Sequence, residues 1–277
     1  MNREEFCLQI LESPFLEDKT SLPPEELRWG EKPLDVQIPN LPNREKKISF
    51  SEKKTKIPKF DTLGEPQNVA ITLHHFANHE LMAVELFAWA ILNFPNATLR
   101  EKNGWWHSLT EEIQHFHMYA NRIRQLGLEF GERPINSLFW NHLKYMSTKE
   151  KFQAVMCLGF EGANLDYSFL YRNVFRYYSD LETSSIMEKV YFDEIIHVRR
   201  GVTSFPKELR TSGEFWSYYL GLLDKPLTPR RAKGMYFSRE ARTKALFPTA
   251  FIDQLEVYED EWSTKRAYQD LSKFLSK

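Results

Sequence analysis

Apolar residues recur with a helical period through most of the chain between about residue 67 and residue 204. This pattern predicts four long helices, at 67–94, 100–127, 148–175 and 180–204. Pro95 cannot continue the first helix, and a short polar turn at Ser179 and Asp180 joins the last two. The connections are therefore short, long and short. That is the layout of a bundle built from two helical hairpins with one long crossover.

The segments on either side of this region have a different pattern. Residues 3–12 predict a short helix, and the proline-containing stretch 13–69 predicts an extended arm with little regular structure. Later in the chain we expect a helix at 213–223, a loop rich in proline and arginine at 225–233, and one or two helices beyond. The all-α chain is thus expected to have three parts, which are an N-terminal helix and arm (1–66), a four-helix bundle (67–204) and a C-terminal helical extension packed on the bundle (205–277).

Composition excludes several classes of protein. The 277 residues are 42% hydrophobic and 14% aromatic, which is enough for a folded core. A formal net charge of −1 gives no basic footprint for nucleic acid. The best apolar run, 83–94, is broken by Glu85 and is too short to cross a membrane, and the N-terminus lacks the pattern of a signal peptide. Cys7 and Cys157 are too far apart in sequence to form a local metal-binding pair. We therefore expect a soluble cytoplasmic protein with no membrane partner and no clear nucleic-acid footprint.

A five-residue sequence that occurs twice indicates the chemistry of the chain. Residues 111–115 (EEIQH) of the second helix and 193–197 (DEIIH) of the fourth both read acid-Glu-Ile-x-His. Residues three positions apart lie on one face of a helix, so the Glu and the His of each copy can bind the same metal ion. One Glu-x-x-His arises often by chance, whereas two copies in the same context are a much stronger signal. The predicted ligands are Glu112 with His115 and Glu194 with His197.

The other two helices each place one glutamate within an apolar stripe. At about 100° per residue, Glu80 lies at the centre of the stripe, whereas Glu85 points about 140° away. The neighbours of Glu80 on this face are Leu73, Phe76, Val84, Phe87 and Ile91. The same construction places Ala154, Cys157 and Leu165 around Glu161. An unpaired carboxylate in such a stripe is costly, and a bound metal removes that cost. The spacings agree as well, since 112 − 80 = 32 residues in one half and 194 − 161 = 33 in the other.

A Glu from each of two helices and a Glu-x-x-His from each of the other two form the di-metal carboxylate set of ferritin-like bundles. Residues 67–204 therefore resemble the ferritin-like di-iron superfamily, and more narrowly an uncharacterised ferritin-like family known only as a domain of unknown function. The segments that carry the narrower resemblance are 79–86 (HELMAVEL), 161–166 (EGANLD), 193–197 (DEIIH) and, near the C-terminus, 231–242 (RAKGMYFSREAR). The resemblance implies a ferritin-like fold and a metal site, but no substrate. Asn164 stands where a third Glu-x-x-His would have its histidine, so Glu161 is expected to bind as a lone carboxylate.

The nature of the six ligands indicates the metal. Carboxylate and imidazole groups suit iron or manganese. Zinc usually takes fewer ligands in a tetrahedral site. Two iron ions are therefore expected, with manganese or a mixed manganese–iron pair as alternatives.

Residues beside the predicted ligands each have two interpretations. Glu111 and Asp193 either accept the second N–H of a ligand histidine across the bundle or are solvated acids at its edge. Tyr119, Cys157 and Tyr191 either line a pocket near the metals or belong to the ordinary core. Glu111 itself is an alternative ligand, although the helical face and the match between the two copies favour its neighbour.

Two other groups of residues are outside this set. Surface or hydrogen-bonded roles are expected for the remaining histidines, which are His74, His75, His79, His107, His117 and His142. Basic residues after the fourth helix either gather an anionic substrate or form an ion-paired, solvated surface. They are Arg230, Arg231, Lys233, Arg239 and Arg242.

Three functions of different classes fit these expectations. The favoured one is a di-iron oxidase or hydroxylase that uses O₂ or peroxide, an external electron donor and an unknown small-molecule substrate. The long aromatic crossover and the 277 − 204 = 73 residues after the fourth helix supply material for a substrate pocket. The second is a ferroxidase or peroxidase that handles iron. Such bulky extensions argue against a storage cage, so a monomer or dimer is expected. The third is a non-catalytic helical binding module with structural metals.

Overall fold

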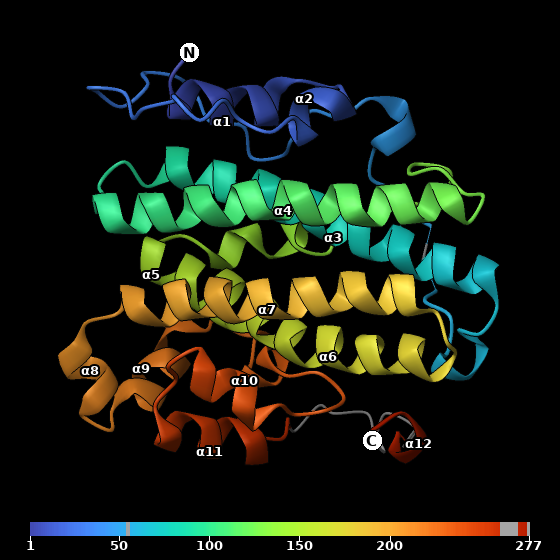
Figure 1. Cartoon of the computed structure of the whole chain (residues 1–277). Coiled ribbons are helices and arrows are strands. Elements are labelled where there is room, and N and C mark those ends of the chain that lie inside the picture. Colours follow the sequence, from blue (N-terminus) through green and yellow to red (C-terminus); the bar gives the residue numbers. More distant parts are fainter. Residues whose placement is uncertain (54–55, 261–270, 276–277) are drawn as a thin grey trace. The chain divides into compact units, whose positions relative to one another are not determined.

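The computed structural model describes residues 1–53, 56–260 and 271–275 of the chain. Regular structure within these ranges is helical, apart from an isolated bridge between Phe50 and Ile135 (Figure 1). The chain divides into two compact units, residues 1–144 and residues 145–277. The expected division into arm, bundle and extension stays a prediction. Within the described part of the chain, no helix combines the length and apolarity needed to cross a membrane.

Two long helices that pack against each other form the centre of the first unit, namely α3 (Pro66–Asn93) and α4 (Leu99–Gln125). Both lie within two residues of the predicted bounds. Pro66 begins α3, where its missing N–H costs nothing. A capping box begins α4, in which the Thr98 hydroxyl accepts from the Glu101 N–H at 3.2 Å and the Glu101 carboxylate accepts from the Thr98 N–H at 2.7 Å.

The N-terminal segment packs on this pair of helices. Helix α1 (Arg3–Glu12) contacts α3, as does the short α2 (Leu16–Thr20), which also contacts α4. From there to α3 the described residues contain two 3₁₀ turns, η1 (Lys46–Ile48) and η2 (Phe60–Thr62), and little other regular structure, which agrees with the predicted extended character of this segment.

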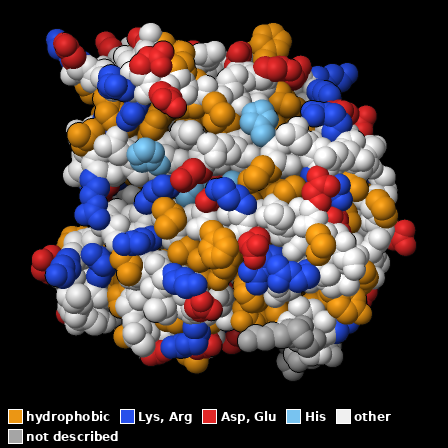
Figure 2. Space-filling model, in the orientation of Figure 1, with side chains coloured by type: hydrophobic (Ala, Val, Ile, Leu, Met, Phe, Trp, Pro, Cys, Tyr) orange, Lys and Arg blue, Asp and Glu red, His pale blue; other side chains and the backbone are white. Residues whose placement is uncertain are grey.

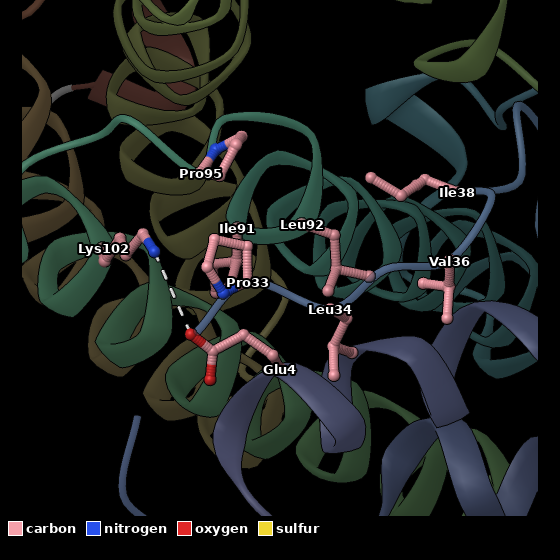
Figure 3. A pocket seen from close by; sticks show the side chains of 9 residues that line it. All are labelled: Glu4, Pro33, Leu34, Val36, Ile38, Ile91, Leu92, Pro95 and Lys102. Atoms are coloured by element: carbon pink, nitrogen blue, oxygen red, sulfur yellow. Dashed lines mark ion pairs between the residues drawn. The ribbon is translucent and has the colours of Figure 1, made fainter. Parts of the chain in front are cut away.

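Part of the arm packs on the end of α3, where its apolar side chains face the helix (Figure 3). Pro33, Leu34, Val36 and Ile38 of the arm lie there with Ile91 and Leu92 of α3. Glu4 and Lys102 form an ion pair beside them at 3.9 Å. The space left is about 10 Å³, which holds about one water molecule and no larger ligand. This contact is therefore structural.

A buried group of charges also fixes the arm to α3. The Glu85 carboxylate accepts from both Arg44 Nε (3.0 Å) and Arg44 Nη2 (2.6 Å), and from the Trp140 indole N–H at 3.1 Å. Lys19 Nζ lies 3.3 Å from Glu85 Oε1, and its side chain and that of Glu85 are fully buried. Burial lowers the pKa of Lys19, and the neighbouring Glu85 opposes that effect. Glu85 thus ties together α2, the arm, the crossover and α3.

The second unit begins with a continuous helical run. It consists of α5 (Lys149–Phe152), the π-helical η4 (Gln153–Phe160) and α6 (Glu161–Tyr177). After the turn at Ser179, where φ is 63°, α7 (Leu181–Ser204) packs against α6. The Asp180 side chain caps α7 by accepting from the Thr183 N–H at 3.1 Å. The third and fourth predicted helices are confirmed, but the π-helical stretch was not predicted, because the sequence pattern was read with α-helical geometry throughout.

Short helices complete the second unit (Figure 1). They are α8 (Lys207–Thr211), α9 (Phe215–Leu222), η5 (Pro229–Ala232), α10 (Arg239–Lys244), α11 (Thr249–Val257) and α12 (Ser272–Leu275). The expected helix at 213–223 corresponds to α9. Both α10 and η5 contact α6, which carries one of the predicted ligands.

Candidate metal centre

Three predicted ligands come together in the first unit. Glu80 lies on α3, whereas Glu112 and His115 lie on α4, and all three are at most 5% exposed. One oxygen or nitrogen atom of each lies within 4.8 Å of the corresponding atoms of the others. His115 Nδ1 lies 3.2 Å from Glu112 Oε2. We call these three residues the first half-site.

The other three predicted ligands come together in the second unit. Glu161 is the first residue of α6, and Glu194 and His197 lie on α7. All three are buried, and their ligand atoms also lie within 4.8 Å of one another. His197 Nδ1 lies 3.4 Å from Glu194 Oε2. We call these residues the second half-site.

The Glu-x-x-His pairs of the two half-sites have nearly the same geometry. In each, the Nδ1 atom of the histidine faces an Oε2 atom of the glutamate that precedes it by three residues, at 3.2 and 3.4 Å. Two ligand atoms that each lie about 2.1 Å from one metal ion, with a right angle between the two metal–ligand bonds, are about 3 Å apart. Each pair therefore fits a single transition-metal ion. Each half-site also buries two carboxylates, which supports the same interpretation, since buried carboxylates need a compensating charge.

Asn164 adds a contact that the sequence analysis did not predict. Its amide Nδ2 donates to Glu194 Oε1 at 2.7 Å, so it holds the carboxylate whose other oxygen faces His197. A second hydrogen bond of this kind fixes the orientation of a ligand carboxylate. The signal was present in the sequence, because Asn164 follows Glu161 by three positions and therefore shares its helical face.

The π-helical η4 ends directly before the predicted ligand Glu161. The helical wheel that placed Ala154 and Cys157 beside Glu161 assumed α-helical turns, whereas the hydrogen bonds of a π-helix span five residues. Cys157 is nevertheless buried close to the half-site. Burial raises the pKa of its thiol well above the ordinary value, and the charge of Glu161 adds to that effect.

Gly201 allows α7 to lie close to η4. A Cβ atom at this position would lie 2.6 Å from Cys157 Cβ, which is closer than carbon atoms can pack, and 3.1 Å from Leu158 Cδ1, which is a tight contact. A glycine is required at this position because a side chain would not fit. The close approach holds η4 against α7, the helix that carries Glu194 and His197.

The acids that precede the ligand glutamates lie in less buried positions. Asp193 forms an ion pair with the exposed Lys189 on its own helix. Glu111 is half-buried, whereas Glu112 is fully buried. Burial therefore favours Glu112 as the ligand. An interaction of Glu111 or Asp193 with a histidine of another helix stays a prediction.

The two tyrosines near the predicted ligands are buried among aromatic rings. The Tyr119 ring lies 5.8 Å from that of Phe76, and the Tyr191 ring lies 5.6 Å from that of Phe169. These contacts are of the kind that core tyrosines make. The contacts fit the interpretation that both tyrosines belong to the ordinary core. They do not test whether either tyrosine lines a pocket near the metals.

Several of the remaining histidines have hydrogen-bonded roles, as expected. His117 Nε2 lies 2.7 Å from the Thr20 carbonyl, and His142 Nδ1 lies 2.7 Å from the Leu138 carbonyl. His79, which precedes Glu80, packs between aromatic rings, with centroids 4.3 Å from His75 and 5.0 Å from Phe139. Burial lowers the pKa of His79 well below its ordinary value.

For the basic residues after α7, the ion-paired interpretation is confirmed at three positions. Arg242 is completely buried against Asp166 and has no access to a substrate. Arg239 pairs with Asp253 at 2.5 Å and with Glu256. Lys233 pairs with Glu259 at 3.6 Å and also donates to the Glu256 carbonyl at 2.8 Å. The alternative that Arg242 gathers an anionic substrate is wrong, because α10 turns it into the core of the second unit.

Comparison with protein families supplies an independent finding. Residues 15–253 match the family model described as Protein of unknown function (DUF455). The chain belongs to the DUF455 family. The matched region contains both half-sites, Asn164 and the Asp166–Arg242 pair, so these features lie within the part shared with DUF455 proteins. No curated protein and no solved structure matches the chain significantly.

Proposed function

We propose that this DUF455 protein is a ferritin-like di-metal protein whose two half-sites together bind two iron ions. The single observation that carries the proposal is the repeated pair of buried Glu-x-x-His contacts, with N–O separations of 3.2 and 3.4 Å. Each half-site also has a second buried carboxylate within ligand distance, Glu80 in one and Glu161 in the other. A four-helix arrangement of α3, α4, α6 and α7 is part of this proposal, because only that arrangement unites the six ligands.

The set of ligand atoms favours iron. Four carboxylates and two imidazoles are hard and intermediate donors, which suit iron and manganese, with a mixed pair as a further alternative. No cysteine belongs to either half-site in the described residues, and thiolate ligands would have favoured other metals.

We propose that the protein acts as an oxidase or hydroxylase of a small-molecule substrate. A pair of carboxylate-bound irons supplies the capacity to activate dioxygen when it is bound. The residues of the chain hold the ligands in place, since Asn164 orients Glu194 and the buried helices keep bulk water from both half-sites. Electrons must come from an external donor, because the chain lacks a cysteine pair for a second iron centre.

The test is dioxygen consumption by iron-reconstituted protein with a chemical reductant and a broad set of metabolites. We expect one class of metabolite to raise the rate in the wild type and to have no effect in Glu194→Ala. The matched control is Glu188→Ala, which removes an acid of the same helix that pairs with Arg172. Oxidation of ferrous iron with no stimulation by any metabolite would instead support the ferroxidase alternative and would contradict the hydroxylase proposal.

A further inference from the structure

A short loop of the crossover, residues 131–136, is tied to α3 at both of its ends. At one end, the Gly131 N–H donates to His74 Nε2 at 3.0 Å. At the other end, Asn78 Nδ2 donates to the Asn136 carbonyl at 3.0 Å. His74 and Asn78 are both buried, so their structural role is to hold the loop against the N-terminal half of α3.

The arm runs beside the same loop. The Ser51 N–H donates to the Ile135 carbonyl at 2.8 Å, next to the bridge between Phe50 and Ile135. Gly131 also lies against the arm, because a Cβ atom at this position would be 2.9 Å from the Lys47 carbonyl oxygen. Backbone contacts therefore fix the loop on this side as well, and the side chains that it carries start from defined positions.

A cavity of about 230 Å³ is lined by residues of the loop, the arm and α3. A cavity needs only about 10–15 Å³ of such volume to hold one water molecule, so this one has room for a small molecule. None of the predicted metal ligands lines it. Glu80 points about 160° away from Asn78 around α3, so the cavity and the first half-site use different faces of this helix.

Two cations without ionic partners line the cavity. Lys56 and Arg133 are exposed, and neither forms an ion pair with another residue that the structure describes. No acid lines the cavity in the described part of the chain, and the nearby Glu132 turns its carboxylate to the Glu129 N–H at 2.9 Å. On the face of the molecule in Figure 2, by contrast, cations and acids are interspersed. A concave surface lined by charges of one sign attracts the opposite sign, so the cavity favours an anion.

The wall that α3 contributes to the cavity also offers a neutral donor. Burial lowers the pKa of His74 to about 4 and the charge of Arg133 adds to that effect, so Arg133 lies close to this wall. Asn136 Oδ1 accepts from the Leu138 N–H at 3.0 Å, so Asn136 Nδ2 donates to His75 Nδ1 at 3.4 Å. Burial lowers the pKa of His75 to about 4, so near pH 7 this half-buried ring is neutral and carries its proton on Nε2. That N–H has no acceptor among the described residues.

We propose that this cavity binds the phosphate group of a small molecule. Arg133 and Lys56 neutralise its two negative charges, and the His75 Nε2–H donates to one of its oxygens. A guanidinium donates two parallel hydrogen bonds to a phosphate, and an ammonium group acts as a point charge beside it. Two positive charges with no negative one match a doubly charged oxyanion better than a singly charged carboxylate.

The rest of the cavity wall suits an organic group attached to the phosphate. Ile71 and Pro134 are its apolar residues, and they can contact the carbon skeleton of a phosphate ester. Esters and free inorganic phosphate share the same charged chemistry. The site uses none of the predicted metal ligands, so the proposal stands independently of the metals.

Isothermal titration calorimetry with four probes tests the proposal on the full-length protein at about pH 8, where phosphate is doubly charged. Inorganic phosphate is compared with acetate, and phenyl phosphate with benzoate, so each pair differs in its anionic group. We expect each phosphate probe to bind at least about tenfold more tightly than its carboxylate counterpart. Tighter binding of phenyl phosphate than of inorganic phosphate identifies an ester as the ligand, and equal affinities identify free phosphate.

Two double variants locate the binding. Lys56→Gln with Arg133→Gln should weaken the preferred phosphate probe at least about tenfold, because it removes both cations at exposed positions where folding is not at risk. Lys32→Gln with Arg124→Gln is the matched control, since both side chains are exposed outside the cavity wall and the net charge changes equally. The control should leave the affinity unchanged.

Four results would each overturn the proposal. They are the absence of binding by both phosphate probes, carboxylates that bind as tightly as phosphates, an affinity that the Lys56 and Arg133 double variant leaves unchanged, and an equal loss of affinity in the control. Phosphate held by metal ions at the half-sites would produce the third result, because neither cation belongs to a half-site.

Discussion

Arg242 donates to both carboxylate oxygens of Asp166, from Nη1 to Oδ1 at 2.7 Å and from Nη2 to Oδ2 at 2.8 Å, with both side chains fully buried. The same guanidinium donates to the Gly162 carbonyl at 3.2 Å, directly after the ligand Glu161. Asp166 also accepts from the Gly234 and Ser238 N–H groups, at 2.8 and 2.7 Å. This pair therefore fastens the chain between η5 and α10 to the helix that presents Glu161.

Loss of Arg242 should destabilise the second unit strongly. Arg242→Met leaves the Asp166 charge buried without its partner, which costs about 3–5 kcal/mol. Urea unfolding followed by circular dichroism measures the free energy of unfolding. Arg239→Met is the control, because Arg239 lies at the surface, and it should have little effect. The double variant Arg242→Met with Asp166→Leu should recover part of the loss, and equal destabilisation by the two single arginine variants would contradict this account.

Substitution of Gly201 should separate α7 from η4. Gly201→Ala places a Cβ 2.6 Å from Cys157 Cβ, so one of the helices must move, at a cost of about 1–3 kcal/mol. Gly221→Ala is a matched control, because Gly221 also lies in a helix but has no atom within 4 Å of the added Cβ. That change should be neutral or stabilising, by up to about 1 kcal/mol. Thermal unfolding of the two variants gives the comparison, and similar melting temperatures would be inconsistent with the close packing.

Removal of the Asn164 amide should weaken metal binding without unfolding the chain. Asn164→Ala deletes the hydrogen bond that orients Glu194, and loss of such a contact typically lowers metal affinity about 10–100-fold. Competition with a chromogenic chelator measures the affinity. Asn173→Ala on the same helix is the control, since the Asn173 side chain bonds to Arg172 instead. An unchanged affinity in Asn164→Ala would show that Glu194 needs no such support.

The first unit should lose stability in mild acid because of His74 and His75. Burial lowers the pKa of each from 6.5 to about 4, so the unfolded chain binds more protons between these values. The stabilising effect of the neutral rings is fully present above about pH 6.5 and is lost as the pH falls to about 4. A shift of this size corresponds to at most about 3 kcal/mol for each ring.

Unfolding measured at several pH values in His75→Asn should therefore show a shallower decline than in the wild type. His107→Asn is the control, because His107 is exposed on α4, and its decline should match that of the wild type. Parallel curves for all three proteins would contradict the contribution of His75.

The sequence was sufficient for the elements and ligand groups that depend on local periodicity. The helices that carry Glu80, Glu112, Glu161 and Glu194 were predicted within a few residues, because each follows a helical repeat with ordinary end signals. Each Glu-x-x-His could be assigned to one helical face for the same reason. The association of each pair with a second glutamate followed from matched spacings.

Other features depend on contacts between distant parts of the chain and could not be predicted in this way. Glu85 is held by Lys19 and Arg44, 66 and 41 residues away, and periodicity says nothing of such partners. Arg242 is buried because of the path that the chain takes between η5 and α10. The sequence of that segment has no periodic pattern from which the path could be predicted. The π-helical η4 was missed because its widened turns have no distinct pattern of apolar residues.

The most direct test of the central claim is the metal content of the protein after anaerobic reconstitution with ferrous iron and removal of unbound metal. The account predicts two irons for each wild-type chain, a loss of bound iron in both Glu112→Ala and Glu194→Ala, and full retention in Glu188→Ala, whose carboxylate pairs with Arg172. A wild-type protein that binds no transition metal, or variants of Glu112 and Glu194 that keep both irons, would contradict it.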